Sequence, residues 1–313
     1  MSVQGNIMVT VRCITYNHAP YIRKCLEGFV MQKTSFRFEV VVHDDASTDG
    51  TADIVREIAA KYPDIITPIL QQENQYSKGK GTLSRVLKPY MKGKYVAWCE
   101  GDDYWTDPHK LQKQVDFLEA HPDYVLCYSN AEVVDENNVP IFHNTTRRYS
   151  GNVSKQLIKK GNFVITASTC FRNLFSDWEK ERATIPLKLY MGDKPMWLFY
   201  STKGKFKYFS EKMVAYRVLT ESASHSKDFN KILAFKDNGE KIALYFNERY
   251  GIGVPERTIR KDYAKGKARA AAKISRSVFS DYYKQLIRQY PEAILDPRLL
   301  TVAFLRIVVN KNV

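Results

Sequence analysis

The N-terminal third of the chain alternates short apolar runs with stretches in which apolar residues recur at helical spacing. The runs that predict buried strands cover residues 8–15, 38–43, 65–70 and 95–99. The stretches that predict helices cover residues 21–31, 51–62 and 82–91. Strands and helices that alternate with short connections predict a parallel sheet with helices on both faces.

Beyond residue 110 the pattern is more mixed. It predicts helices over residues 110–121 and 191–200, strands over 125–128, 163–165 and 207–216, and a hairpin around Asn137 and Asn138. From Asp228 the spacing is helical almost to the last residue. We therefore expect an α/β domain over residues 1–226, with a mostly parallel sheet flanked by helices, and a helical, basic C-terminal region over residues 227–313.

Polar residues gather where three of the predicted strands end. The first strand ends in Thr15, Tyr16 and Asn17, and the second ends in Asp44 and Asp45. The fourth ends in Glu100, Gly101, Asp102 and Asp103. In such sheets ligands bind beyond the carboxyl ends of the strands. Capping of the following helix would need one acid per loop, and we expect Ser47, Thr48 and Asp49 to cap helix 51–62. The extra acids therefore indicate a ligand site. No glycine-rich phosphate loop follows the first strand, so a dinucleotide or P-loop site is not favoured.

Composition excludes several classes of protein. The chain has 313 residues, of which 44% are hydrophobic, and it has no apolar run long enough for a transmembrane helix. The first residues do not follow the pattern of a signal peptide, so we expect a cytoplasmic location. The five cysteines show no CxxC spacing, and we expect neither a disulfide framework nor a zinc site.

The net charge of +14 is the unusual feature of the composition, and part of it is concentrated over residues 257–288. Such an excess attracts the phosphates of nucleic acid, of anionic lipid or of a diphosphate substrate. A solvated helix face explains the same charges equally well, so composition alone leaves the partner open.

Three segments together resemble family 2 glycosyltransferases, which have the GT-A fold. They are VTVRCITYNHAPYIRKCL, EVVVHDDASTDGT and GKYVAWCEGDDYWTDPHKLQKQ, and the resemblance extends over residues 8–226. It implies inverting transfer of a sugar from a nucleotide-diphosphate donor to an acceptor hydroxyl, with Mn²⁺ or Mg²⁺ as cofactor. It further implies a nucleotide-binding half (residues 1–110), an acceptor-binding half (111–226), a UDP-sugar as donor, and a role in capsule, O-antigen or exopolysaccharide assembly.

The resemblance also assigns roles at the strand ends. Asp102 and Asp103 stand at the family's metal motif, so one of them would bind the ion while the other lies near the ribose. Glu100 departs from the usual leading acid, which leaves its role open. Asp44 and Asp45 match the pair that recognises the base.

Thr15, Tyr16 and Asn17 would border the base in that arrangement. Tyr16 either stacks on the base or lies in the core.

A catalytic base is expected at the start of a helix in the second half. Asp193, in the segment MGDKPMW, is the best match, although Gly192 stands where the family often has Glu. A helix N-cap before Pro195 would also explain this Asp. His225 is a candidate to complete the metal shell, with solvent exposure as the alternative. Arg217 and Lys78 are candidate contacts for the diphosphate.

Two other functions remain open at this level. A sugar-nucleotide nucleotidyltransferase would also use metal-binding carboxylates, but the first strand is not followed by the glycines that it needs. A nucleic-acid-binding protein would explain the charge, but acidic strand ends argue against nucleic acid over the cleft.

The basic C-terminal region suggests a further partner. An acceptor that is a glycan or a lipid-linked glycan would bring the enzyme to the inner face of a membrane. We therefore expect weak, peripheral contact with anionic lipid through six cations, Lys261, Lys265, Lys267, Arg269, Lys273 and Arg276. The apolar stripe that follows, over residues 278–287, is expected to pack on the catalytic domain.

Overall fold

A computed structural model describes residues 6–79, 82–141, 148–219 and 228–303, and it divides the chain into two compact units. The first unit consists of Met1–Val153, Phe163–Ile185 and Lys203–Val218, and the second of Ser154–Asn162, Pro186–Thr202 and Leu219–Val313. Two segments that precede residue 226 therefore belong with the C-terminal helices. The predicted domain boundary after residue 226 stays a prediction.

The first unit contains the whole sheet. Its strands are β1 (Val9–Thr15), β2 (Phe38–Asp44), β3 (Ile66–Leu70), β4 (Tyr95–Glu100), β5 (Tyr104–Trp105), β6 (Tyr124–Val134), β7 (Cys170–Arg172) and β8 (Lys205–Arg217). Its helices are α1 (Ala19–Val30), α2 (Thr51–Lys61), α3 (Thr82–Leu87), α4 (Lys110–Ala120) and α6 (Phe175–Thr184), with 3₁₀ turns η1 (Lys88–Tyr90) and η2 (Thr166–Ser168).

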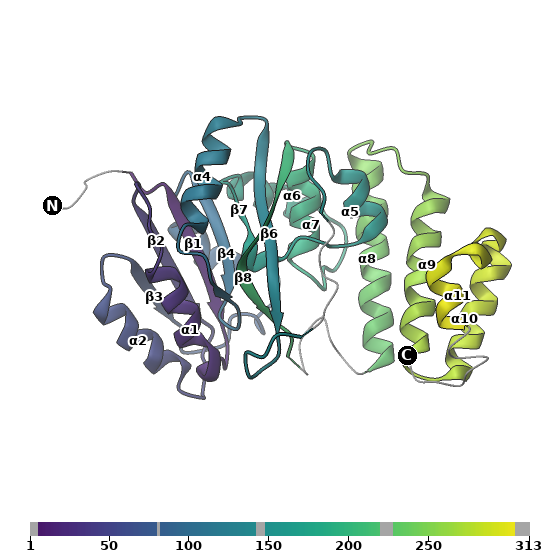
Figure 1. The fold of residues 1–313 in the computed structure, drawn as a ribbon, viewed down its shortest axis with the longest axis horizontal. Coiled ribbons are helices and arrows are strands. Elements are labelled where there is room, and N and C mark those ends of the chain that lie inside the picture. Colours follow the sequence, from purple (N-terminus) through teal and green to yellow (C-terminus); the bar gives the residue numbers. More distant parts are fainter. Residues whose placement is uncertain (1–5, 80–81, 142–147, 220–227, 304–313) are drawn as a thin grey trace. The chain divides into compact units, whose positions relative to one another are not determined.

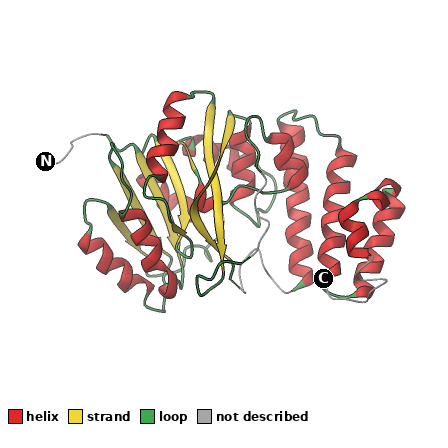
Figure 2. Cartoon of the chain, viewed as in Figure 1, coloured by secondary structure: helices red, strands yellow, loops and turns green. Residues whose placement is uncertain are grey.

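The strands form one sheet in the order β3-β2-β1-β4-β7-β6-β8-β5 (Figures 1 and 2). Strands β3, β2, β1 and β4 are parallel neighbours, as are β6 and β8, whereas β7 runs antiparallel to β4 and β6, and β5 runs antiparallel to β8. The predicted α/β fold, a mostly parallel sheet flanked by helices, is confirmed.

The main core lies on one face of this sheet. Alternate residues of β1, namely Val9, Val11 and Cys13, are fully buried and belong to one cluster with buried residues of α1, α2 and α4. This is the pattern expected when successive side chains of a strand point to opposite faces. On the other face of β1 lie Thr10 and Arg12, whose polar groups need partners; Thr10 bonds to Glu39 at 2.8 Å.

Several predicted elements are longer or shorter than expected. The helix predicted over residues 82–91 ends as α3 at Leu87 and continues as a 3₁₀ turn, because Pro89 cannot donate the hydrogen bond that an α-helix requires. Strand β6 reaches Val134, well past the predicted end at residue 128, and the predicted hairpin follows it, with an antiparallel bridge between Val134 and Pro140.

The strand predicted over residues 163–165 is wrong. Ile165 precedes the turn η2 and its carbonyl accepts the hydroxyl of Ser168 at 2.7 Å, and pairing begins only at Cys170. Phe163 instead packs its ring against Tyr128 and Tyr149. The helices α5 and α6 and the short strand β5 were not predicted, because α5 and α6 are rich in charged residues and β5 has only two residues.

The second unit is helical over its described residues. It comprises α5 (Ser154–Lys160), α7 (Asp193–Ser201), α8 (Phe229–Arg249), α9 (Glu256–Ala272), α10 (Arg276–Gln289), η3 (Pro291–Leu295) and α11 (Pro297–Ala303). The predicted helix over residues 191–200 and the helical C-terminal region are thus found. Among the described residues, no helix combines the length and the apolar character needed to cross a membrane.

Part of the apolar stripe of α10 packs within the helical unit. Leu286 belongs to a small core with Ala268 of α9, Ala293 of η3 and Leu299 of α11, and Tyr282, Tyr283 and Ile287 pack against it. This part of the stripe therefore stabilises the helical unit itself, and the predicted packing on the catalytic domain stays a prediction.

Candidate active site

The register of the parallel strands brings the three polar strand ends to one edge of the sheet. Thr15 at the end of β1 pairs with Asp44 of β2, and its neighbour Ile14 pairs with Glu100 of β4. The predicted convergence of these ends is therefore what the structure contains. All of them lie in the first unit.

Two of the loops at this edge are bonded to each other. The backbone N–H of Asn17 donates to the Ser47 hydroxyl at 2.8 Å, and the Asn17 side chain accepts the N–H of Thr48 at 2.9 Å. Asp49 accepts the N–H of Ala19 in the first turn of α1 at 2.9 Å. We predicted that Ser47, Thr48 and Asp49 cap α2. This prediction is wrong for the N-cap position of α2, which Gly50 occupies with a φ of 95°. These polar residues join the two loops, and this explains why so many occur in the segment.

Asp44 and Asp45 are both buried and point to different partners. Asp44 accepts the N–H of Ser47 at 3.1 Å and its hydroxyl at 2.5 Å. Asp45 accepts the N–H groups of Gln75 and Tyr76 at 2.7 and 3.0 Å. Ala46, which follows Asp45, has a φ of 65°, a left-handed conformation that is uncommon for a residue with a Cβ. A carboxylate has about four acceptor positions, so both acids keep capacity for a further donor.

Exposed aromatic rings occur on the loops around this pair. Tyr16 is 47% exposed and Tyr76 is 76% exposed. An exposed Tyr16 removes the alternative of a core tyrosine and leaves the ring available for stacking. The hydroxyl of Thr15, by contrast, is buried, and a Cβ on Gly101 would lie only 2.6 Å from it, so Gly101 allows the β4 loop to approach β1 closely.

Asp102 and Asp103 differ in their surroundings. Asp102 is partly exposed, whereas Asp103 is 4% exposed and accepts the backbone N–H of Arg217 at 2.7 Å. Burial, and then the neighbouring charge of Asp102, raise the pKa of Asp103 well above its usual value. A buried carboxylate beside a second one fits a divalent cation, since hard oxygen ligands suit Mg²⁺ or Mn²⁺ and a bound charge would relieve the repulsion.

No group of three or more His, Cys, Asp or Glu side chains in the described part of the chain is placed to hold a metal. Two carboxylates still suffice for Mg²⁺-type sites, which substrate phosphates and water complete. His225, predicted as a further ligand, lies outside the described residues.

Arg217 is buried and most of its donors are engaged. Its Nε donates to the Asp102 carbonyl at 2.8 Å, and its terminal nitrogens donate to the carbonyls of Asp135 and Glu136 and to the side chain of Asn138. Arg217 therefore connects the loop of Asp102 and Asp103 to the turn after β6. Lys78, the other predicted diphosphate contact, forms an exposed ion pair with Glu73.

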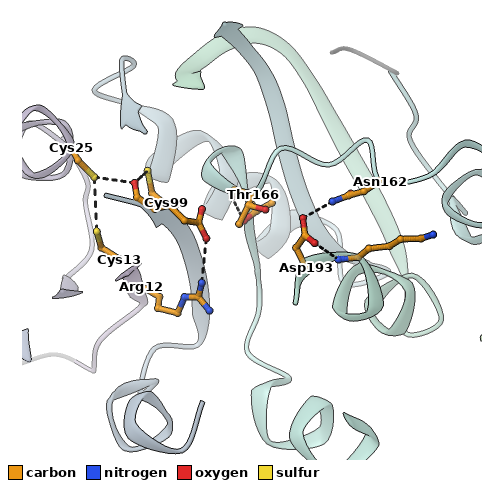
Figure 3. Close-up of polar contacts among 10 residues, drawn as sticks. Arg12, Cys13, Cys25, Cys99, Asn162, Thr166 and Asp193 are labelled. Atoms are coloured by element: carbon orange, nitrogen blue, oxygen red, sulfur yellow. Dashed lines mark hydrogen bonds and ion pairs between the residues drawn. The ribbon is translucent and has the colours of Figure 1, made fainter. Parts of the chain in front are cut away.

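Glu100 has a partner that sequence reasoning missed. Its carboxylate lies 3.4 Å from the guanidinium of Arg12 (Figure 3). The same guanidinium stacks 3.5 Å from the ring centre of Trp98. Burial lowers the pKa of Arg12 to about 10, and the charge of Glu100 opposes this. An arginine in the middle of the apolar run VTVRCIT was the available signal. Glu100 thus compensates a buried cation beneath the site.

Cys13, Cys25 and Cys99 lie under the same strand ends. The sulfurs of Cys13 and Cys25 are 4.0 Å apart, and all five cysteines of the chain are free and buried. The prediction of no disulfide framework agrees with this. Burial raises the pKa of Cys25 and Cys99, so these thiols stay protonated.

Asp193 belongs to the second unit, whereas the other described candidates belong to the first. It is the first residue of α7, and Gly192 is the N-cap, so the predicted alternative of an Asp N-cap is wrong. Its carboxylate accepts the amide of Asn162 at 2.6 Å and the N–H of Lys194 at 2.7 Å (Figure 3). Burial raises its pKa above the usual value, although these hydrogen bonds and the charge of Lys194 oppose the shift. A raised pKa suits a general base.

At least three of the six cations predicted to face a membrane form ion pairs within the second unit. Lys261 pairs with Glu292 at 3.0 Å and Lys265 with Asp296 at 2.9 Å. Lys267 pairs with Glu240, also at 3.0 Å. The charge available to an external anion is therefore smaller than the sequence indicates.

The family model described as Glycosyl transferase family 2 matches residues 10–180 of this chain. An uncharacterized protein of Mycobacterium tuberculosis is 34% identical over 237 residues, which cover 75% of this chain and 66% of that protein. The chain thus spans slightly less than two thirds of the length of this relative.

Two solved structures have a similar fold. One is S. aureus TarS, residues 1–349, in complex with UDP-GlcNAc, with a TM-score of 0.54 and 15% identity over 91% of this chain and 92% of that one. The other is the mannosyltransferase PcManGT from Pyrobaculum calidifontis in complex with GDP-Man and Mn²⁺, with a TM-score of 0.50 and 16% identity over 98% and 89%. At these identities the likeness concerns the fold, which is that of GT-A glycosyltransferases.

Proposed function

Because this chain belongs to glycosyl transferase family 2, we propose that it transfers a sugar, with inversion, from a nucleotide-diphosphate donor to an acceptor hydroxyl. The observation that carries the proposal is the edge at which β1, β2 and β4 end, where two pairs of aspartates and an exposed tyrosine come together. The family match favours sugar transfer over nucleotidyl transfer and over nucleic-acid binding.

The donor would bind at this edge of the first unit. Asp44 and Asp45 would accept N–H groups of the base, on which Tyr16 would stack, with Thr15 and Asn17 beside it. Lys78 and Arg217 stay candidates for the diphosphate, although their ion pair and hydrogen bonds would have to rearrange. A UDP-sugar is the expected donor, and TarS in complex with UDP-GlcNAc supports this choice.

Asp102 and Asp103 would hold Mn²⁺ or Mg²⁺, and the Mn²⁺ in the PcManGT complex supports a divalent ion. When bound, the ion would neutralise negative charge on the leaving diphosphate. The protein contributes the fixed position of Asp103, which the Arg217 backbone N–H holds. His225 stays a candidate as a further ligand.

Asp193 would act as the general base. Inversion requires a carboxylate that takes the proton of the acceptor hydroxyl as the oxygen attacks the anomeric carbon, and an Asp of raised pKa is suited to this. The proton moves from the hydroxyl to a carboxylate oxygen of Asp193, and the nucleoside diphosphate leaves with the electron pair of the broken glycosidic bond.

The acceptor would be a glycan or a lipid-linked glycan in surface-glycan assembly, made at the cytoplasmic face of a membrane. The paired lysines of α9 reduce the expected contact with anionic lipid but do not remove the region's positive excess.

A thermal-shift panel of the full chain tests the proposal. UDP-glucose, UDP-galactose, UDP-GlcNAc, UDP-GalNAc and GDP-mannose are each added with and without Mn²⁺. We expect one donor to raise the melting temperature only when Mn²⁺ is present, because a ligand that binds the folded state stabilises it. Release of the nucleoside diphosphate from that donor then measures turnover. No Mn²⁺-dependent shift with any of them, together with no turnover, would contradict the proposal.

A further inference from the structure

The backbone just before Asp193 is bound by one buried side chain of α8. The side-chain oxygen of Asn238 accepts the N–H of Tyr190 at 3.0 Å, and its amide nitrogen donates to the carbonyl of Lys188 at 2.5 Å. Asn238 is 7% exposed, so water competes little for these bonds. One amide therefore fixes the chain at two points shortly before α7 begins.

The residue directly after Asp193 is held by the same turn of α8 and by α9. Lys194 is 3% exposed, and its ammonium donates to the Gly239 carbonyl at 3.1 Å and to the hydroxyl of Tyr263. It also lies 4.8 Å from the ring centre of Tyr263. Among the described residues, no carboxylate is within ion-pair distance of this ammonium. A buried cation held by neutral groups is costly, so simple packing would favour an apolar residue here.

Gly239 allows this arrangement. A Cβ at this position would lie 3.2 Å from Cε1 of Tyr263 and 3.7 Å from Nζ of Lys194. The first distance is tight, so a methyl group here would press on the ring of Tyr263, whose hydroxyl accepts the Lys194 ammonium, whereas the second is an ordinary contact. Asn238 and Gly239 thus hold the chain on both sides of Asp193, and Asn162 holds the carboxylate itself.

We propose that Asn238, Gly239 and Tyr263 are positioning residues, which fix the Asp193 carboxylate for catalysis through the 188–190 backbone and the side chain of Lys194. The inference rests on the proposed function of Asp193 as the base. It gives the C-terminal helices α8 and α9 a direct part in the reaction, because the position of the base depends on them.

The charge of Lys194 adds an electrostatic effect. Burial lowers the pKa of Lys194 to about 7, and the charge of Asp193 opposes this; in turn Lys194 lowers the pKa of Asp193. Of the groups that pack against Lys194, α9 contributes Tyr263, which burial keeps protonated, and α8 contributes a backbone carbonyl. The charge of Lys194 therefore keeps the Asp193 carboxylate ionised at pH values at which it would be protonated without that charge.

A double-mutant cycle tests the proposal in the full chain. Turnover is the release of nucleoside diphosphate from whichever donor of the panel is hydrolysed or transferred fastest, at saturating Mn²⁺. The variants are Lys194→Met, Asp193→Asn and the double variant. We expect Lys194→Met to lower kcat about 10²-fold with the donor KM unchanged, since a small misplacement of a catalytic group has such an effect. The double variant should be no slower than Asp193→Asn alone, because both changes act on one group.

The outcomes separate the two proposals. If Asp193→Asn is slow but Lys194→Met is normal, or if the two losses multiply, the positioning role is overturned and the base assignment stands. If Asp193→Asn turns over normally, the base assignment is wrong and the positioning role is overturned with it.

Milder variants cover the case in which Lys194→Met does not fold. Tyr263→Phe removes one hydrogen bond and Gly239→Ala adds one methyl group, and each should lower kcat about tenfold, as a small misplacement would. Tyr245→Phe, on the same helix as Gly239, is the matched control and should leave kcat unchanged. Equal loss in the control would overturn the role.

The pH profile of kcat provides a readout that loosened packing would not move. In Lys194→Met the acid limb should shift to higher pH, because the pKa of Asp193 rises when the nearby cation is absent. A lower maximum of kcat in Lys194→Met, with the acid limb of the profile at the same pH as in the wild type, would overturn the electrostatic part of the proposal.

Discussion

The carboxylates of the first unit and Asp193 of the second are held in different ways. The acids of the first unit accept backbone N–H groups. Asp44 accepts that of Ser47, Asp45 accepts those of Gln75 and Tyr76, and Asp103 accepts that of Arg217. Asp193 depends on the side chain of Asn162, besides the N–H of its own neighbour. A backbone donor stays in place when its side chain is changed, whereas a side-chain donor is lost with one substitution. The first site should therefore tolerate changes around its acids better than the second.

The largest effect on turnover is expected from a substitution of Asp103, one of the acids of the first unit. Asp103→Asn keeps an acceptor for the Arg217 N–H but removes the charge needed for Mn²⁺. We expect turnover to fall by about 10³-fold, the size seen when a charge-stabilising group is lost. The free energy of unfolding should change by less than about 1 kcal/mol, because the lost charge was destabilised by burial.

Urea unfolding and nucleotide release measure the two effects of Asp103→Asn. Asp64→Asn, at an exposed position, is the matched control and should change neither. Retained Mn²⁺-dependent turnover with a large loss of stability would instead make Asp103 a structural acid.

An intermediate effect is expected at Arg217, which combines both kinds of contact. Arg217→Met keeps the backbone N–H to Asp103 but leaves the carbonyls of Asp102 and Asp135 without their donor. Unsatisfied buried acceptors cost about 1–3 kcal/mol each, so stability should fall by roughly 2–4 kcal/mol. Because Asp103 keeps its donor, activity at saturating Mn²⁺ should fall less than in Asp103→Asn.

Titration of turnover with Mn²⁺ separates the affinity for the ion from kcat in Arg217→Met. A loss as complete as that of Asp103→Asn, in a folded protein, would show that the guanidinium itself acts on the substrate.

The smallest effect on turnover is expected at Lys110. This residue and Lys194 are buried lysines, one in each unit. Lys110 is fully buried, and its ammonium donates to Gln114 at 2.8 Å and to the Thr169 carbonyl at 3.3 Å. Burial lowers its pKa to about 8. Unlike Lys194 it has no candidate catalytic acid beside it in sequence, so Lys110→Met should leave kcat unchanged.

Stability should respond to Lys110→Met in a pH-dependent way. Below pH 8 both the folded and the unfolded chain carry the proton, and the folded state bears the full cost of the buried charge. Between about pH 8 and 10.5 the unfolded chain binds more protons, so the wild type gains stability relative to the variant as pH rises. The gain is at most about 3 kcal/mol at 1.36 kcal/mol per pKa unit. A difference in urea unfolding that stays flat from pH 7 to 10 would contradict it.

Sequence reasoning was most successful where the contacts are local. The hydrophobic periodicity of the sequence predicted the strands at 8–15, 38–43 and 95–99. The topology of parallel sheets predicted that the ends of these strands converge. The ion pair of Arg12 with Glu100 joins residues 88 positions apart, and neither residue alone indicates the other. The predicted N-cap failed because Gly50 takes that position, although Asp49 still accepts the N–H of Thr51, the first residue of α2. The further partners of Ser47 and Asp49, Asn17 and Ala19, lie on another loop. Around Asp193 almost nothing was predictable, because Asn162, Asn238 and Tyr263 lie 31 to 70 positions away in the sequence.

The interleaving of the two units along the chain has a consequence for synthesis on the ribosome. Helices α5 and α7 are translated before β8, yet they belong with α8 and α9, which emerge later. The side chains of Met196, Trp197, Leu198, Phe199 and Tyr200 are all buried in the finished protein. Until α8 leaves the exit tunnel, α7 lacks the part of its packing that α8 provides, in a chain whose first strands are already available to pair. Nascent chains stalled before residue 229 should therefore bind a chaperone that recognises exposed apolar segments, and chains stalled well beyond α9 should release it.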